Sequence, residues 1–303
     1  RFKGTYSKTL QVQSRVKMLE KLVLLEVDEE DTSALRLKFP PSPRSGNYPV
    51  IMENVGKTYG DHVVFKNANL TIERGDKVAF VGKNGEGKST LVNLIPRFYD
   101  VREGKVLIDG ADVRDLPLTE LRHAIGAVPQ RAVLFKGTLR DNMRWGKEDA
   151  TDEEIWHALD VAQARDFIEA KGEGLDLMID QGGHNLSGGQ RQRLTIARAL
   201  VRDPQILIMD DSASALDFAT DARLRRAIRE NTKDMTVFIV SQRATTIRNA
   251  DTILVLDDGK LAGIGNHKQL LKECDVYREI CLSQLSKAVS YTHLRAHETG
   301  AYL

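Results

Sequence analysis

Residues 82–90 have the composition and spacing of a loop that binds phosphate groups. The stretch reads Gly82, Lys83, Asn84, Gly85, Glu86, Gly87, Lys88, Ser89 and Thr90. Its glycines let the backbone curl so that several N–H groups point to one centre, where they can donate to polyphosphate oxygens. In such a loop Lys88 reaches the β- and γ-phosphates, and the Ser89 hydroxyl ligates Mg²⁺. The spacing therefore predicts that a nucleotide is bound by Gly82, Asn84, Gly85, Gly87, Lys88, Ser89 and Thr90.

A strand and a helix must hold this loop in place. An apolar run at 78–81 precedes the loop, and a largely apolar run at 91–95 follows it. A phosphate-binding loop requires this context, because the start of the following helix adds partial positive charge. The alternative is a glycine-rich turn that matches by chance, and the preceding strand weighs against it.

Two carboxylates follow a second apolar run. Residues 206–211 read Ile-Leu-Ile-Met-Asp-Asp, which predicts a buried strand that ends at Asp210 and Asp211. Asp210 is expected to hold Mg²⁺, through water, beside Ser89. Asp211 stands where a general base or a group that orients water would lie. Together with the loop, these carboxylates predict a Mg-ATP site.

Residues 186–190, which read Leu-Ser-Gly-Gly-Gln, form a second predicted anion-binding end. A serine and two glycines at the start of a helix leave backbone N–H groups free to donate. The residues concerned are Ser187, Gly188, Gly189 and Gln190. Because one nucleotide needs only one phosphate-binding loop, this second end requires a separate explanation.

Three aromatic residues could have a role in binding or in packing. Tyr59 follows a predicted strand at 50–55, and it could either stack on a purine or pack at the end of the strand. The residues alone leave both possibilities open. Trp145 and Trp156 lie in a region of helical patterning that runs to about residue 168, and we predict that both belong to the core of a helical subdomain.

Composition sets wider bounds. The chain has 303 residues and a formal net charge of +1, which gives no general preference for nucleic acid or for acidic partners. No apolar run approaches the ~20 residues of a membrane span and no signal peptide opens the chain, so we expect a soluble protein. The initial Arg1 suggests a fragment. Cys274 and Cys281 match neither a metal nor a redox spacing, and we expect reduced thiols at least half-buried on one helix face.

The order of these motifs resembles that of ATP-binding cassette (ABC) ATPases. Residues 82–90, Gln130, 186–190, 206–211 and 214–217 resemble the Walker A, Q-loop, signature, Walker B and D-loop elements. The resemblance covers about residues 46–286. It implies an α/β P-loop ATPase core with an antiparallel β-subdomain before it and an inserted helical subdomain at about 131–195.

The same resemblance implies how the second anion-binding end is used. ABC ATPases form head-to-tail dimers in which each ATP lies between the Walker A of one subunit and the signature of the other. Ser187, Gly188 and Gly189 would then grip the γ-phosphate that the partner holds. Tyr59 resembles the adenine-stacking aromatic of the A-loop, and Gln130 is implied as a catalytic-site residue and metal ligand.

Residues 94–286 resemble more specifically the nucleotide-binding domain of ABC exporters. The segments that carry this likeness are 96–100, 104–110, 137–142 and 181–185. An exporter implies ATP and Mg²⁺ as cofactors, a transmembrane domain as partner, and a location on the cytoplasmic face of the membrane.

Two positions depart from the hydrolytic pattern of the family. Asp211 stands where Glu is usual, and Gln242 stands at the switch position, where His is usual. The side chain of Asp is one methylene shorter than that of Glu. The amide of Gln, unlike the imidazole of His, cannot take up a proton and a positive charge. Both changes resemble the degenerate-site subunit of heterodimeric exporters, for which slow hydrolysis is expected. Ordinary activity is one alternative, since Asp is a carboxylate too, and a non-hydrolysing regulatory module is another.

The two ends of the chain do not resemble an exporter domain. Residues 1–90 resemble the linker and domain start of ABC-F proteins, which are ribosome-associated translation ATPases, and we expect a basic helix and a proline-rich linker at 1–45. We therefore hypothesise a chimera joined near the P-loop, with the ABC nucleotide-binding domain at 46–287. Residues 288–303 are expected to be a non-native tail.

Overall fold

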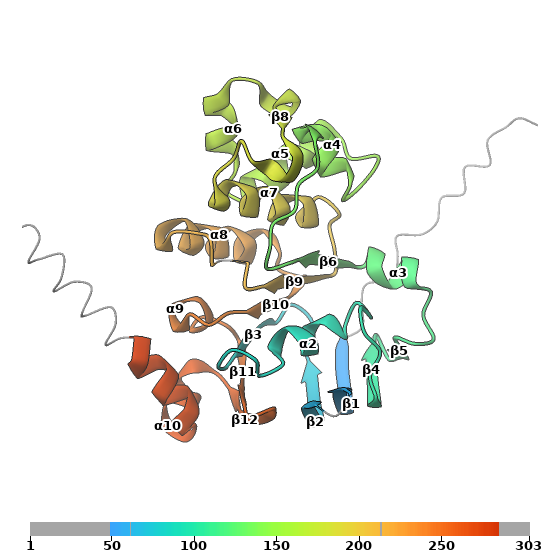
Figure 1. The fold of residues 1–303 in the computed structure, drawn as a ribbon, viewed down its shortest axis with the longest axis vertical. Helices are drawn as coiled ribbons and strands as arrows, with labels where there is room; N and C mark the ends of the chain where they lie inside the picture. The colour runs from blue at the N-terminus through green and yellow to red at the C-terminus, as the bar shows by residue number, and fades with distance from the viewer. Residues whose placement is uncertain (1–48, 61, 213, 285–303) are drawn as a thin grey trace, which may run out of the picture. The chain divides into compact units, whose positions relative to one another are not determined.

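The computed structural model describes residues 49–60, 62–212 and 214–284 (Figure 1). The expectations for residues 1–45 and 288–303 lie outside these residues. Within the described part, the chain forms a mixed α/β fold, with the antiparallel β-subdomain and the helical subdomain that the sequence predicts.

The β-subdomain is an antiparallel sheet in the order β2-β1-β4-β5. Its strands are β1 (Val50–Tyr59), β2 (His62–Ile72), β4 (Glu103–Ile108) and β5 (Ala111–Asp112). Val50 pairs with Ile72 on one side and with Ile108 on the other, and all three side chains are buried. The apolar runs at 63–65 and 70–72 belong to one strand, β2, and the polar residues between them lie opposite register shifts in β1.

The ATPase core is a second sheet, in the order β12-β11-β3-β10-β9-β6. It consists of β3 (Lys77–Val81), β6 (Ile125–Val128), β9 (Ile206–Asp210), β10 (Thr236–Val240), β11 (Thr252–Asp257) and β12 (Lys260–Gly265). Every pair is parallel except β11 with β12. All five residues of β3 are buried, as expected for a parallel strand covered on both faces. The carboxyl ends of β3 and β9 therefore meet at one edge of the sheet, where open α/β sheets bind ligands.

The helical subdomain lies at the top of the view in Figure 1, beyond the core sheet. It contains α4 (Leu139–Arg144), α5 (Asp152–Val161), α6 (Arg165–Lys171), the start of α7 (Gly188–Leu200), the short strands β7 (Gly137–Thr138) and β8 (Met178–Ile179), and the 3-10 turns η1 (Gly174–Asp176) and η2 (Gln181–Gly183). Capping boxes start three of its helices, because Thr138, Thr151 and Ser187 each accept a hydrogen bond from the backbone of a residue three positions on.

The remaining helices cover the core sheet. They are α2 (Lys88–Asn93), α3 (Leu118–His123), α8 (Phe218–Asn231), α9 (Ala244–Ile247) and α10 (His267–Glu273), and residues 275–284 form a further helix. One buried cluster combines side chains from both sides of residue 90, including Phe65, Phe80, Leu94 and Val106. The β-subdomain and the ATPase core thus share one hydrophobic interior.

Two expectations about the helices need correction. Trp145 is not in the core: its side chain is 69% exposed and its ring stacks on Phe135, with 4.6 Å between the centroids. The inward face of α4 already places Leu139 and Met143 in the core, and Trp145 follows the helix as its C-cap residue. Trp156, in contrast, packs against the core.

The two cysteines are buried, as expected, but they do not share a helix face. Cys274 lies after the end of α10, and Cys281 belongs to the helix over residues 275–284. Both side chains pack in one cluster with Tyr277. The chain breaks the helix at Cys274, whose φ of −119° and ψ of 106° are extended rather than helical.

Candidate nucleotide-binding site

The phosphate-binding loop connects β3 to α2 as the sequence predicts. Gly87 is the N-cap residue of α2 and has a φ of 79° in the left-handed region that favours glycine. A Cβ atom at Gly87 would lie 2.4 Å from Cγ1 of Val64. A Cβ atom at Gly82 would lie 2.4 Å from the carbonyl oxygen of Leu256. The loop therefore needs glycine at both positions for close approach as well as for conformation.

Lys88 lies inside the curl of the loop. Its side chain is only 7% exposed, and its ammonium donates to the carbonyl oxygens of Gly82, at 2.9 Å, and Lys83. Burial lowers the pKa of Lys88, since removal from water disfavours the charged form. A phosphate group beside the ammonium would offset this cost, which fits the predicted role of Lys88.

Ser89 and Asp210 form the candidate magnesium site. The Ser89 hydroxyl donates to Oδ1 of Asp210 at 2.8 Å and so links the start of α2 to the end of β9. Burial raises the pKa of Asp210, and the Ser89 hydrogen bond opposes that shift. Hydroxyl and carboxylate oxygens are ligands that Mg²⁺ prefers, and Mg²⁺ usually takes one or two carboxylates together with substrate phosphates. These residues fit the ion. Within the described part of the chain, no group of three or more His, Cys, Asp and Glu residues forms a metal cluster of protein ligands alone.

Asp211 and Gln130 lie together next to this pair. The Gln130 amide donates to Oδ2 of Asp211 at 3.4 Å, and the backbone N–H of Asp211 donates to the carbonyl of Val240 at 2.9 Å. Burial, and then the charge of Asp210, raise the pKa of Asp211. The backbone of Asp211 has a φ of 43°, which few residues other than glycine adopt. A raised pKa and an unusual backbone conformation are both frequent at functional positions.

Tyr59 stands at the rim of the pocket rather than in the core. Its side chain is 44% exposed, and its ring meets the edge of Tyr99 with 5.9 Å between the centroids. The ammonium of Lys57 lies 5.1 Å from the centre of the Tyr59 ring. These contacts hold an aromatic surface at the pocket, which fits the stacking of a purine better than packing at the end of a strand.

One cavity of about 480 Å³ joins these groups. Most of the predicted site residues line it, namely Tyr59, Asn84, Gly85, Gly87, Lys88, Ser89, Thr90, Gln130, Asp210, Asp211 and Gln242. Gly82 does not line the cavity but supplies the carbonyl that accepts from Lys88. The sequence did not identify Val64, Glu86, Val240 and Ser241 as lining residues, because their own types signal no phosphate chemistry.

The second anion-binding end does not line this cavity. Ser187 caps α7: its hydroxyl accepts from the N–H of Gln190 at 3.2 Å, and its own N–H donates to the Gln190 side chain at 2.9 Å. The Gln190 side chain is therefore engaged within the helix start. Ser187 and Gly188 are exposed, so this helix end is accessible to a ligand held by another molecule.

Two residues missed by the sequence analysis fix the switch segment that follows β10. The guanidinium of Arg243 donates to the carbonyls of Ser214, at 2.9 Å, and Leu216, at 3.2 Å. The side-chain amide of Gln284 bonds to the backbone of both Gln242 and Ala244. No sequence signal marks Gln284, since it is 42 residues from Gln242 and lies near no motif.

This fold and this cavity define a P-loop nucleotide-binding protein. Residues 65–214 match the family model described as ABC transporter. The chain carries an ABC transporter ATP-binding domain and is homologous to the nucleotide-binding domains of exporters. Its relatives include an uncharacterized ABC transporter ATP-binding protein of Mycobacterium tuberculosis, which is 44% identical over 254 residues, or 82% of this chain and 43% of the relative.

Two further matches have more informative descriptions. The ATP-dependent lipid A-core flippase of Syntrophus aciditrophicus is 44% identical over 229 residues, which are 76% of this chain and 38% of the flippase. A solved bacterial Atm1-family ABC exporter with ATP bound superimposes with a TM-score of 0.76 at 35% identity, and the match covers 91% of this chain and 47% of the exporter chain. The chain thus spans less than half the length of each of these relatives.

Proposed function

We propose that this protein is the ATP-binding and ATP-hydrolysing subunit that energises an ABC exporter. The observation that carries the proposal is the contact between Ser89 and Asp210, which joins the phosphate-binding loop to the carboxylate strand in one cavity. The descriptions of the flippase and of the Atm1-family exporter support the transport role.

The proposal includes a second nucleotide-binding domain as partner. Ser187 and Gly188 are exposed on a helix end outside the cavity of their own chain, so they suit the γ-phosphate of an ATP held by that partner. Because Asp211 and Gln242 depart from the family pattern while Ser187, Gly188 and Gly189 do not, we infer a heterodimer. In it, this chain completes the partner's active site and turns over its own ATP slowly.

The proposal also includes a transmembrane domain as partner, which would place the protein on the cytoplasmic face of the membrane. Phe135 and the exposed Trp145 form an aromatic stack on the helical subdomain, close in sequence to Gln130. Exposed aromatic surface of this kind is typical of protein interfaces. No helix in the described part of the chain has the length and hydrophobicity to cross a membrane.

The test is ATP binding and turnover by the whole chain beside the variants Asp211→Glu and Gln242→His. We expect the wild type to bind Mg-ATP and to hydrolyse it slowly, with a rise on the order of tenfold or more when both residues are replaced, since a well-placed general base contributes ~10²- to 10⁴-fold. Lys88→Ala is the control that removes nucleotide binding. Fast turnover by the wild type would contradict the proposed slow hydrolysis. Failure of the wild type to bind ATP would contradict the proposal that the protein is an ATP-binding subunit.

A non-hydrolysing regulatory nucleotide-binding module is the second candidate, and the same two residues favour it. Gln242 can donate a hydrogen bond to a γ-phosphate but cannot carry a proton. This candidate predicts that the double replacement leaves turnover at the background rate although ATP still binds.

The chimera hypothesis remains a proposal about origin. It rests on the likeness of residues 1–90 to ABC-F proteins, and residues 1–48 lie outside the described part. Against it, the alignment with the mycobacterial relative is longer than residues 94–286, and the buried cluster combines both sides of residue 90. Sequencing across the P-loop in nucleic acid from the source tests the chimera hypothesis. Co-sedimentation of the protein with ribosomes in the presence of ATP would favour the ABC-F role.

A further inference from the structure

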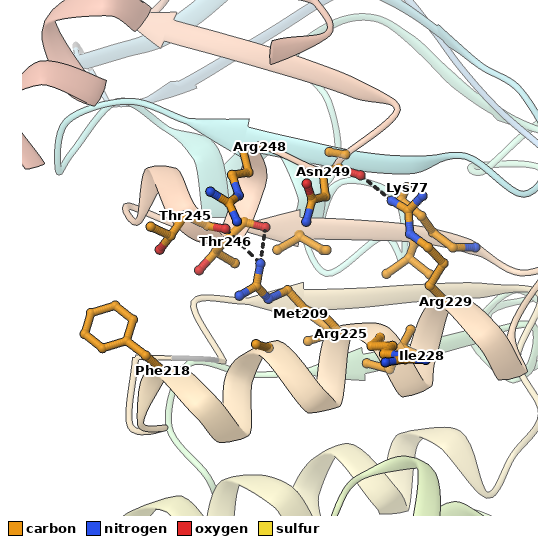
Figure 2. Close-up of a pocket in the computed structure, with 15 residues that line it drawn as sticks. Lys77, Met209, Phe218, Arg225, Ile228, Arg229, Thr245, Thr246, Arg248 and Asn249 are labelled. Atoms are coloured by element: carbon orange, nitrogen blue, oxygen red, sulfur yellow. Dashed lines mark hydrogen bonds between the residues drawn. The ribbon is translucent and has the colours of Figure 1, made fainter. Parts of the chain in front are cut away.

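A groove separate from the nucleotide cavity lies between α8, α9 and the core strands β9 and β10 (Figure 2). Its volume is about 540 Å³, within the range of roughly 300–1,000 Å³ that small-molecule sites occupy. Its accessible apolar wall comes from Phe218 and Ala222, which are exposed, and from Ile239, which is half-buried, whereas Met209, Ile228 and Val237 belong to the core behind them. None of the residues assigned to the nucleotide site lines this groove.

The charged side chains that line the groove are all cationic. They are Lys77, Arg225, Arg226, Arg229 and Arg248. Carboxylates outside the lining pair with three of these arginines: Asp221 with Arg225, Glu230 with Arg226, and Asp251 with Arg229. The Lys77 ammonium donates instead to the backbone carbonyls of Gly75, Thr232 and Met235, and Arg248 forms no ion pair with any residue that the structure describes. Because Asp251, Asp76 and Asp234 also act on the charge of Lys77, the excess positive charge among the described residues rests on Arg248.

Two polar side chains at the end of α9 are without partners among the described residues. The guanidinium of Arg248 and the amide of Asn249 make no hydrogen bond or ion pair there, and both residues are exposed. Figure 2 shows them on the side of the groove opposite α8, which carries Arg225. Arg225 itself is fixed, since it pairs with Asp221 and donates to the carbonyls of Thr245 and Thr246, each at 2.9 Å.

We propose that this groove binds a small organic anion. The apolar body of the ligand lies against Phe218, Ala222 and Ile239, and its carboxylate, sulfonate or phosphate accepts hydrogen bonds from Arg248 and Asn249. A predominantly apolar wall with a few directed polar groups is the usual composition of a small-molecule site. The fork of a guanidinium matches the oxygens of such an anion, with which it can form two parallel hydrogen bonds. The site is independent of the proposed transport function.

The test uses 1-anilinonaphthalene-8-sulfonate, a fluorescent aromatic sulfonate, and the uncharged N-phenyl-1-naphthylamine, which has the same rings. We expect saturable binding of the sulfonate to the whole chain. Arg248→Ala should raise its Kd about tenfold, the loss expected for one charge-assisted hydrogen bond, and should leave the Kd of the uncharged dye unchanged. Arg248→Lys keeps the charge but loses the two parallel donors of the guanidinium, so its Kd for the sulfonate should lie between those of the wild type and Arg248→Ala.

Two further variants test whether both dyes bind in this groove. Ala222→Trp fills the groove from the exposed face of α8 and should abolish saturable binding of both dyes, while Mg-ATP binding shows that the protein is folded. Arg223→Ala removes a guanidinium from the same helix outside the groove, and it should change neither Kd. The proposal is wrong if the wild type does not bind the sulfonate, if Arg248→Ala binds it unchanged, or if Ala222→Trp still binds both dyes.

Discussion

The side chain of Gln284 holds the backbone of Ala244 beside the nucleotide cavity. Its Oε1 accepts from the N–H of Ala244 at 2.7 Å, and its amide nitrogen donates to the carbonyl of Gln242. One side chain of the helix that contains residues 275–284 thus bonds to the chain on both sides of Arg243. The position of the switch residue Gln242 therefore depends on a helix that is remote in sequence.

Replacement of Gln284 should loosen the switch segment. Gln284→Ala removes two hydrogen bonds, so we expect the free energy of unfolding to fall by about 1–2 kcal/mol and the amide of Ala244 to exchange its hydrogen faster. Hydrogen exchange measured by mass spectrometry checks this prediction. Leu282→Ala, which shortens an exposed side chain on the same helix, is the matched control and should leave the Ala244 amide protected. Equal protection in Gln284→Ala would show that the two bonds do not fix the segment.

Gly87 and Gly85 allow a matched comparison in the phosphate-binding loop. Both have positive φ, of 79° and 90°, but a Cβ at Gly87 meets Val64 whereas a Cβ at Gly85 has no atom within 4 Å. Gly85→Ala should cost only the ~1–2 kcal/mol of the left-handed conformation. Gly87→Ala should cost more in urea unfolding, and Val64→Ala in the same chain should recover part of the difference. Equal costs at the two glycines would mean that the contact with Val64 relaxes freely.

Ser89 should control the magnesium dependence of ATP binding. Ser89→Ala removes the hydroxyl that donates to Asp210, and with it the proposed ligand of Mg²⁺. We expect roughly a tenfold loss of ATP affinity in the presence of Mg²⁺, or about 1.4 kcal/mol, and little change when EDTA is present. Ser89→Thr keeps a hydroxyl and should behave as the wild type. A similar loss with and without Mg²⁺ would assign Ser89 to the loop conformation rather than to the metal.

The pH dependence of stability should report the buried charge of Asp211. Because burial raises the pKa of Asp211 in the folded state, its contribution to stability is fully present below the ordinary Asp pKa and is lost as the pH rises through the raised value. Asp211→Asn, which is neutral at every pH, should therefore unfold at a higher temperature than the wild type at pH 7. The two unfolding temperatures should converge toward pH 4. A constant difference across this range would contradict the raised pKa.

The sequence by itself determined the motifs whose chemistry is local. Residues 82–90 form the predicted strand-loop-helix unit, because glycine spacing and the flanking apolar runs act over a few residues. The same holds for the strand that ends at Asp210 and for the helix that begins after Ser187. The resemblance of these motifs, in their order, to those of ABC ATPases was also enough to predict the α/β core with its β-subdomain and helical subdomain.

Only the tertiary structure decided which distant residues meet. Hydrophobicity predicted Trp145 in the core, but Leu139 and Met143 occupy the inward face of α4. The contacts of Gln284 with Ala244 and of Arg243 with Ser214, and the cationic groove between α8 and α9, join residues that no motif relates. The physical reason is that periodicity and turn chemistry fix local backbone conformation, whereas these contacts depend on how helices pack on the sheet, which many weak side-chain interactions determine together.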